Sequence, residues 1–204
     1  MRKVAVLCLL ALLPVLALGQ SAEQKKASVL IVYYSAKGHT RAMAEAVAKG
    51  ARTVEGATVN LLSVADAKVP DVLSADAVIV GSPVYKANVA PPVQEFINSW
   101  PIKDGALRDK LGAAFVTASG ISAGEELTQM DIIHSMLVCQ MVVVGGPDSR
   151  QPLGASAIVG ENSSGKSDEK QEEGLVTEYY LKKGEALGTR VAQLAVRMKN
   201  LKGE

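Results

Sequence analysis

The first stretch that could do chemistry is YSAKGHT at positions 34–40, which is rich in small and hydroxyl-bearing residues. It follows an apolar run and leads directly into an amphipathic stretch, so it should lie at the start of a helix. There the backbone N–H groups of the first turn could bind a phosphate, with the hydroxyls of Ser35 and Thr40 as further donors. The same two hydroxyls could instead only cap the helix, and this stretch alone favours neither interpretation.

Two further stretches could surround a flat ring. Residues 81–92 (GSPVYKANVAPP) follow the third apolar run and contain more turn-forming residues than a simple connection needs. Residues 117–125 (TASGISAGE) follow the fourth run, and their small side chains would let backbone amides approach a heterocycle closely. Three stretches of this kind predict one binding site, provided that the fold brings them together.

The elements that must position these stretches alternate regularly along the chain. Short apolar runs predict strands at residues 29–34, 59–62, 77–80, 113–117 and 141–144. Amphipathic patterns predict helices at residues 40–52, 91–99, 125–137 and 174–199. Because the strands are apolar on both faces, we expect a parallel sheet between two helical layers, a three-layer α/β/α sandwich. In such a sheet ligands bind beyond the carboxyl ends of the strands, where all three stretches would lie.

The amino terminus predicts export. Two basic residues precede an apolar run from Val4 to Leu18, which is shorter than the ~20 residues of a membrane span and is followed by a polar stretch. We therefore expect a signal peptide over residues 1–22, cleaved after Gly19 or Ala22, and a single domain over residues 28–204. The mature protein would be periplasmic or extracellular, without a stable membrane span. An uncleaved anchor helix is the alternative.

The composition of the chain argues against nucleic acid as a partner and against an internal disulfide. The chain has 22 basic and 21 acidic residues, and removing the two basic residues of the predicted signal peptide changes the net charge from +1 to −1. A near-neutral chain argues against nucleic acid as the main partner. Only Cys139 remains after processing, so an internal disulfide is excluded.

One nucleotide-binding motif lacks the context that it needs. Residues 160–167 (GENSSGKS) match the G-x-x-x-x-G-K-[ST] pattern of a P-loop. A P-loop requires a preceding strand, a following helix and a later strand that offers an acidic residue to magnesium. Only one helix is predicted after this motif, and residues 168–173 are highly charged, so we expect a solvated loop.

Several motifs together carry a family resemblance. They are VYYS and GHT within residues 32–40, GSPVY at 81–85 with Asn88, TASG at 117–120, and PLGAS at 152–156. The chain resembles the flavodoxin-like NAD(P)H:quinone oxidoreductases of the tryptophan repressor-binding protein type. This resemblance implies a flavodoxin-like five-stranded parallel sheet of order 2-1-3-4-5, FMN as cofactor, NAD(P)H as electron donor, and a quinone or other small molecule as acceptor.

The resemblance also implies which residues bind the cofactor. The FMN phosphate would lie among Ser35, Lys37, Gly38, His39 and Thr40. The isoalloxazine ring and ribityl chain would lie against Ser82, Pro83, Val84, Tyr85, Lys86, Thr117, Ala118, Ser119 and Gly120. FMN would accept a hydride from NAD(P)H and pass two electrons to the quinone. The alternative, which export favours, is an electron carrier or flavin-binding module without nicotinamide activity. No catalytic residue or metal ligand is assigned.

The chain also departs from that family. The stretch between the second and third strands is short where the family carries an insertion that contributes to tetramer contacts, so a homodimer and a tetramer both stay open. Lys86 and Ala87 stand where an aromatic residue is common, which leaves ring stacking to Tyr85. The family's histidine near the flavin aligns with Cys139 rather than His134. As simpler interpretations, His134 would be a partly buried structural residue and Cys139 a small core residue.

Overall fold

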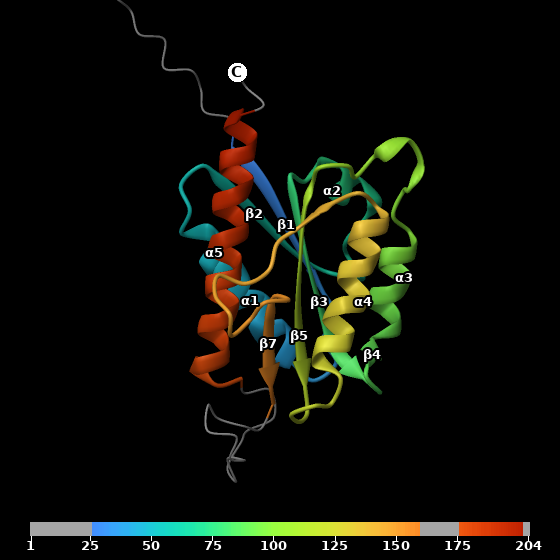
Figure 1. Cartoon of the computed structure of the whole chain (residues 1–204), viewed down its shortest axis with the longest axis vertical. Helices are drawn as coiled ribbons and strands as arrows, with labels where there is room; N and C mark the ends of the chain where they lie inside the picture. Colours follow the sequence, from blue (N-terminus) through green and yellow to red (C-terminus); the bar gives the residue numbers. More distant parts are fainter. Residues whose placement is uncertain (1–25, 160–175, 202–204) are drawn as a thin grey trace, which may run out of the picture.

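The computed structural model describes residues 26–159 and 176–201, which form a parallel sheet with helices on both faces (Figure 1). Its strands are β1 (Ala27–Tyr33), β2 (Ala57–Ser63), β3 (Ala77–Tyr85), β4 (Asn88–Val89), β5 (Leu111–Ala118), β6 (Val142–Val143) and β7 (Ala155–Ile158). Its helices are α1 (His39–Arg52), α2 (Val69–Ser74), α3 (Pro91–Asn98), α4 (Glu125–Val138) and α5 (Glu178–Leu201), with a short 3-10 turn η1 (Lys103–Gly105). The three-layer sandwich expected from the sequence is confirmed.

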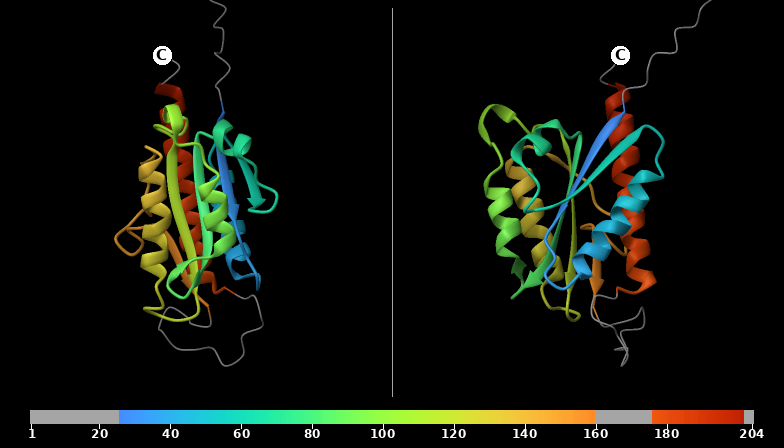
Figure 2. Two further views of the ribbon diagram at one scale, coloured as in Figure 1. Left: turned by 90° about the vertical axis from the view of Figure 1, so that its right-hand side faces the viewer. Right: turned by 180° about the vertical axis from the view of Figure 1, so that it is seen from behind.

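Alternation along the central strands divides the core into two halves. On β1, Val29 and Ile31 pack toward α1 and α5, whereas Leu30 and Val32 pack toward α2, α3 and α4. Figure 2 shows the same arrangement, with α1 and α5 on one side of the sheet and α3 and α4 on the other. Strands that are buried on both faces explain why the sequence shows continuous apolar runs rather than polar alternation.

The strand order confirms the predicted topology, with one addition. The sheet runs β2-β1-β3-β5-β6, and the fifth position is divided between two short strands. β6 pairs with the beginning of β5, at Leu111 and Gly112, whereas β7 pairs with its end, from Phe115 to Ala118. The sequence predicted only residues 141–144 at this position. Glycines and a proline at 145–147 interrupt the strand, and β7 is made mainly of small residues that give a weak strand pattern.

Helices α1 and α5 approach each other closely because glycines line their contact. A Cβ atom on Gly188 would lie 1.9 Å from the carbonyl oxygen of Val47, and one on Gly50 would lie 1.9 Å from that of Glu185. The Thr189 hydroxyl donates to the carbonyl of Gly50 at 3.0 Å. This contact fixes α1 against the sheet, and the first turn of α1 begins at the end of β1.

The predicted signal peptide and the P-loop-like motif lie outside the described residues, so both remain predictions. Within residues 26–159 and 176–201, no helix has the length and apolar composition needed to cross a membrane.

Candidate functional site

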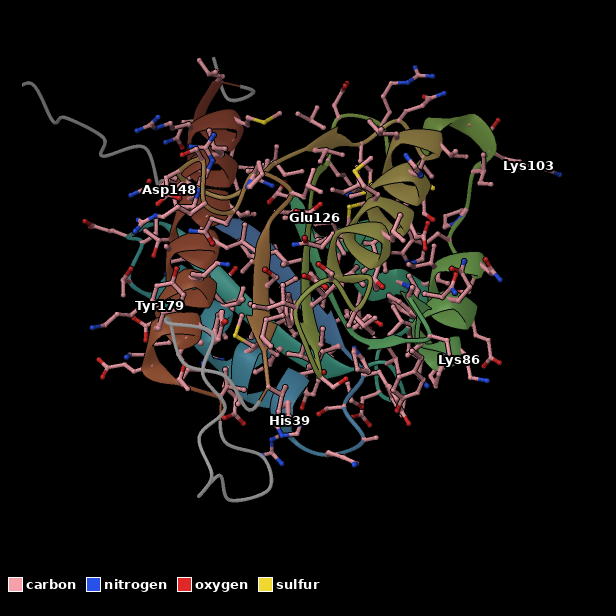
Figure 3. All side chains as sticks on the ribbon, turned by 60° about the horizontal axis from the view of Figure 1, so that its bottom comes forward. His39, Lys86, Lys103, Glu126, Asp148 and Tyr179 are labelled. Carbon is pink, nitrogen blue, oxygen red and sulfur yellow. The ribbon has the colours of Figure 1, made fainter. Side chains whose placement is uncertain are left out.

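A cavity of about 290 Å³ lies beyond the carboxyl ends of β1, β3 and β5. Its lining residues are Ser35, Ala36, Lys37, His39, Thr40, Pro83, Val84, Tyr85, Thr117, Ala118, Ser119 and Val159. Each of the three stretches singled out in the sequence therefore contributes to one cavity, together with Val159 from the end of β7. Figure 3 brings this end of the molecule forward and labels His39 there.

The start of α1 has the geometry of an anion site. Gly38 is the N-cap residue, with a φ of 89°, and no side chain caps the helix. The Ser35 hydroxyl accepts a hydrogen bond from the Gly38 N–H at 3.1 Å, which shapes the turn before the helix. The first N–H that pairs within the helix is that of Ala42, which donates to the Gly38 carbonyl at 2.9 Å. The N–H groups of the first turn of a helix have no carbonyl four residues earlier in that helix to donate to, and the first turn of α1 carries no acidic residue. The interpretation of Ser35 and Thr40 as helix caps is therefore wrong.

Thr40 and Thr117, which both line the cavity, join two of the three stretches. Their hydroxyl oxygens lie 2.8 Å apart, and the two residues are only 1% and 4% exposed. In such a pair one hydroxyl donates and the other accepts, so one O–H remains for an acceptor in the cavity. No sequence signal predicts this pair, because its members are 77 positions apart.

Residues 81–92 form a β-hairpin rather than an open loop. β3 continues past its predicted end at Val80 to Tyr85, and Lys86 and Ala87 make a turn with φ values of 52° and 62° before β4. A Cβ on Gly124 would lie 2.3 Å from that of Ala87, so the turn packs against the residues that precede α4. The hairpin thus gives the cavity a firm wall.

Some predicted contact residues lie beside the cavity rather than on its lining. Ser82 is fully buried behind the wall, where its hydroxyl donates to the Pro83 carbonyl at 2.8 Å and accepts from the Ala90 N–H at 3.0 Å. Gly38 lines a neighbouring hollow instead, and Lys86 lies at the hairpin turn, labelled in Figure 3. Gly120 is also outside the lining, with no atom within 4 Å of an added Cβ.

The buried position of Ser82 leads to a stability prediction. Replacing Ser82 with alanine should leave the buried Ala90 N–H without its acceptor and lower the free energy of unfolding by about 1–3 kcal/mol. Urea denaturation of the variant measures this loss. Ser74→Ala is the matched control, because the exposed Ser74 hydroxyl should change stability by no more than about 0.5 kcal/mol. Equal losses in both variants would show that Ser82 does not hold the hairpin.

Tyr85 forms the aromatic part of the wall. Its ring meets that of Tyr34 edge to face, with centroids 6.4 Å apart and an angle of 89° between the planes. Burial, together with a hydrogen bond to Tyr34, raises the pKa of Tyr85 above its ordinary value. The phenol is therefore neutral at physiological pH, and Tyr85 offers an uncharged aromatic surface, 41% exposed, beside the cavity.

The charge of the lining favours an anionic ligand. Among the described residues that line the cavity there is no aspartate or glutamate, whereas Lys37 and His39 lie next to the start of α1. The lining therefore combines cationic or neutral donors at the start of α1 with apolar and aromatic surface from the hairpin.

Neither of the two residues considered for the family's histidine position lines this cavity. Cys139 ends α4 and is buried among core residues, and burial raises the pKa of its thiol. The prediction that Cys139 is a core residue is confirmed. His134 is exposed, so its prediction as partly buried is wrong: its neighbours Ile132 and Ile133 turn into the core while His134 faces outward.

Comparison with known proteins finds a matching flavodoxin domain model and relatives named as quinone dehydrogenases. The family model of the flavodoxin domain matches residues 30–135. A protein named NAD(P)H dehydrogenase (quinone) from Azorhizobium caulinodans is 36% identical over 159 residues, covering 66% of this chain and 78% of the relative. One of the same name from Cupriavidus metallidurans is 32% identical over 168 residues, covering 65% of this chain and 83% of the relative.

Solved structures show the same fold. A flavodoxin, WrbA-like protein from Agrobacterium tumefaciens superposes with a TM-score of 0.65 at 23% identity, covering 84% of this chain and 99% of that chain. A flavodoxin from the domain Archaea superposes with a TM-score of 0.63 at 25% identity, covering 82% of this chain and 98% of that chain.

Proposed function

Because the chain belongs to the flavodoxin domain family, we propose that it is an FMN-dependent oxidoreductase that takes electrons from NAD(P)H and passes them to a quinone. The observation that carries this proposal is the cavity in which the uncapped start of α1 meets the hairpin and the end of β5. The names of the curated relatives support the choice of donor and acceptor.

The residues present fit FMN at both ends of the cavity. Its phosphate would meet the first N–H groups of α1 together with the Thr40 hydroxyl, where the described lining residues include no carboxylate. Its ring would lie against Tyr85 and the small residues at the end of β5, where Ala118 and Ser119 keep the backbone accessible. A cavity of 290 Å³ is close to the lower end of the roughly 300–1,000 Å³ typical of small-molecule sites.

When bound, FMN supplies the hydride-accepting chemistry, and the chain's own residues hold and shield it. Thr40 and the start of α1 fix the phosphate end, and the neutral Tyr85 phenol keeps one wall of the ring site free of charge. The Ser82 hydrogen bonds and the contact of Ala87 with Gly124 hold that wall in place. Rigid walls of this kind would orient the ring toward an incoming nicotinamide or quinone.

A preference for FMN over riboflavin tests the phosphate end of this proposal. The isolated protein should bind FMN at least about tenfold more tightly than riboflavin, because each charge-assisted hydrogen bond to phosphate contributes about 1.5–3 kcal/mol. Calorimetric titration with FMN, FAD and riboflavin measures the three affinities. If riboflavin bound as tightly as FMN, the proposed contact between the FMN phosphate and the start of α1 would be wrong.

A second candidate is an electron carrier that binds FMN but has no nicotinamide activity. The apolar run at the amino terminus favours it, because that run predicts export and free nicotinamide cofactors are not expected outside the cytoplasm. The two candidates share the cofactor site and differ only in whether NADH or NADPH reduces the bound FMN.

A further inference from the structure

A second cavity, of about 230 Å³, lies on the α5 side of the molecule. One wall is the first part of α5, where Tyr179, Lys182 and Lys183 share one helix face through their i, i+3, i+4 spacing. The other wall comes from residues 148–151, within the segment that separates β6 from β7. Figure 3 labels Asp148 and Tyr179 on this side of the molecule, apart from the His39 label that marks the first cavity.

The segment that forms the second wall is held in shape by its own hydrogen bonds. The Gly146 N–H donates to the Gln151 carbonyl at 2.9 Å, and the Gln151 N–H donates to the Asp148 carbonyl at 3.2 Å. The Asp148 carboxylate also orients the guanidinium of Arg150, with Nη2 at 2.7 Å from Oδ2 and Nε at 3.3 Å from Oδ1. Arg150 therefore enters the cavity wall in a defined orientation, with only two of its five N–H groups used by Asp148.

Lys183 provides a positive charge without an ion-pair partner among the described residues. Its Nζ lies 3.3 Å from the Ser156 hydroxyl and 5.7 Å from the centroid of the Tyr180 ring, whereas Lys182 is paired with Glu178 and Arg150 with Asp148. Burial lowers the pKa of Lys183, and the attraction of Asp148 opposes this shift. A cation that has lost part of its hydration in this way gains from a bound anion.

Gln151 adds a buried polar group to the wall formed by residues 148–151. It is only 5% exposed, and its Oε1 atom has no hydrogen-bond partner within the described ranges. This oxygen is an acceptor, so Gln151 would bind an anion only with the amide turned to place its NH₂ group there.

We propose that this cavity binds a phosphate group, as the free ion or as a monoester, between Lys183 and Arg150. Its charged lining consists of three cations and one carboxylate, and the planar fork of Arg150 matches the oxygens of a phosphate group. Lys183 supplies the unpaired charge, and Gln151 supplies a buried polar group at the same wall. The phosphate could be free or could belong to a nucleotide, and the site is separate from the proposed FMN site.

The test uses isotope-labelled, FMN-saturated protein, in which the start of α1 is already occupied, and follows its amide signals by NMR. Inorganic phosphate at constant ionic strength should give saturable shifts at Arg150 and Lys183. Lys183→Gln and the exposed Arg150→Gln should each weaken this binding by about tenfold or more. Lys103→Gln removes an exposed charge on the opposite side of the molecule from Asp148 and Tyr179 in Figure 3, and it should leave phosphate binding unchanged.

NADP⁺ and NAD⁺, which differ by one phosphate monoester, distinguish the sources. Saturable shifts at Arg150 and Lys183 with NADP⁺ alone assign the site to a nucleotide phosphate, and shifts with inorganic phosphate alone assign it to the free ion. Shifts that do not saturate with either, or that Lys103→Gln reduces as much as Lys183→Gln, would overturn the proposal. If FMN itself does not bind, the same signals can be followed without it, so that failure is separate from failure of this site.

Discussion

Replacing Thr40 with alanine is expected to weaken FMN binding by about ten- to a hundred-fold, because it removes a charge-assisted hydrogen bond worth about 1.5–3 kcal/mol. Thr40 lines the cavity at the start of α1, and with Thr117 as the donor of their hydrogen bond the Thr40 O–H is left for the phosphate. Riboflavin has no phosphate, so its affinity should change little. Calorimetric titration of wild type and variant with both ligands measures the difference.

A matched control separates the phosphate contact from a loss of stability. Thr40→Ala also breaks a buried hydroxyl pair, so the apoprotein should melt at a lower temperature. Thr189→Ala removes a hydroxyl that donates a hydrogen bond to the Gly50 carbonyl, away from the cavity. This variant should have a lower melting temperature but unchanged affinities for FMN and riboflavin. Equal losses of FMN and riboflavin affinity in Thr40→Ala would show that Thr40 does not contact the phosphate.

Replacing Gly188 with alanine should destabilise the protein by about 3 kcal/mol, the upper part of the usual range for overpacking. The added Cβ would lie 1.9 Å from the Val47 carbonyl oxygen and 3.0 Å from the Ala51 nitrogen, and both are backbone atoms of α1 that cannot turn aside. For a protein of this size the melting temperature should fall by roughly 6–12 °C. Thermal unfolding followed by circular dichroism measures it.

Gly184, one turn earlier on α5, provides the control for that substitution. Its added Cβ would lie 3.3 Å from the Ala46 Cβ, 3.4 Å from the Met43 carbonyl oxygen and 3.5 Å from the Met43 Cε, and none of these distances is a clash. Alanine also favours a helix over glycine by about 0.5–1 kcal/mol, so Gly184→Ala should change stability by less than about 1 kcal/mol in either direction. Comparable destabilisation by the two substitutions would contradict the close contact of α1 with α5 at Gly188.

The family resemblance implies the strand order, whereas the sequence pattern alone predicts the layers and the three stretches that meet at the cavity. These features depend on apolar runs of several residues, such as that of β1, which are strong signals in any parallel sheet. β7 was missed because Ala155 to Ile158 is short and contains mainly small side chains. Its place depends on pairing with β5, which is a tertiary contact.

The details of the site depend on contacts that no local pattern encodes. The turn at Lys86 and Ala87 uses positive φ values without glycine or asparagine, so its sequence does not indicate a hairpin. The contact between Thr40 and Thr117 exists only because β1 and β5 flank β3 in the sheet. The resemblance implies a flavin contact for Ser82, and the extension of β3 to Tyr85 leaves its side chain fully buried.

An anaerobic titration of the FMN-loaded protein with NADH and with NADPH, followed by addition of a quinone, tests the central claim most directly. We expect at least one nicotinamide to bleach the visible absorbance of the bound flavin and the quinone to restore it. Dithionite serves as the control that the bound flavin can be reduced. Bleaching by dithionite but by neither nicotinamide would contradict the proposed NAD(P)H:quinone oxidoreductase activity. The protein would then be the electron carrier without nicotinamide activity.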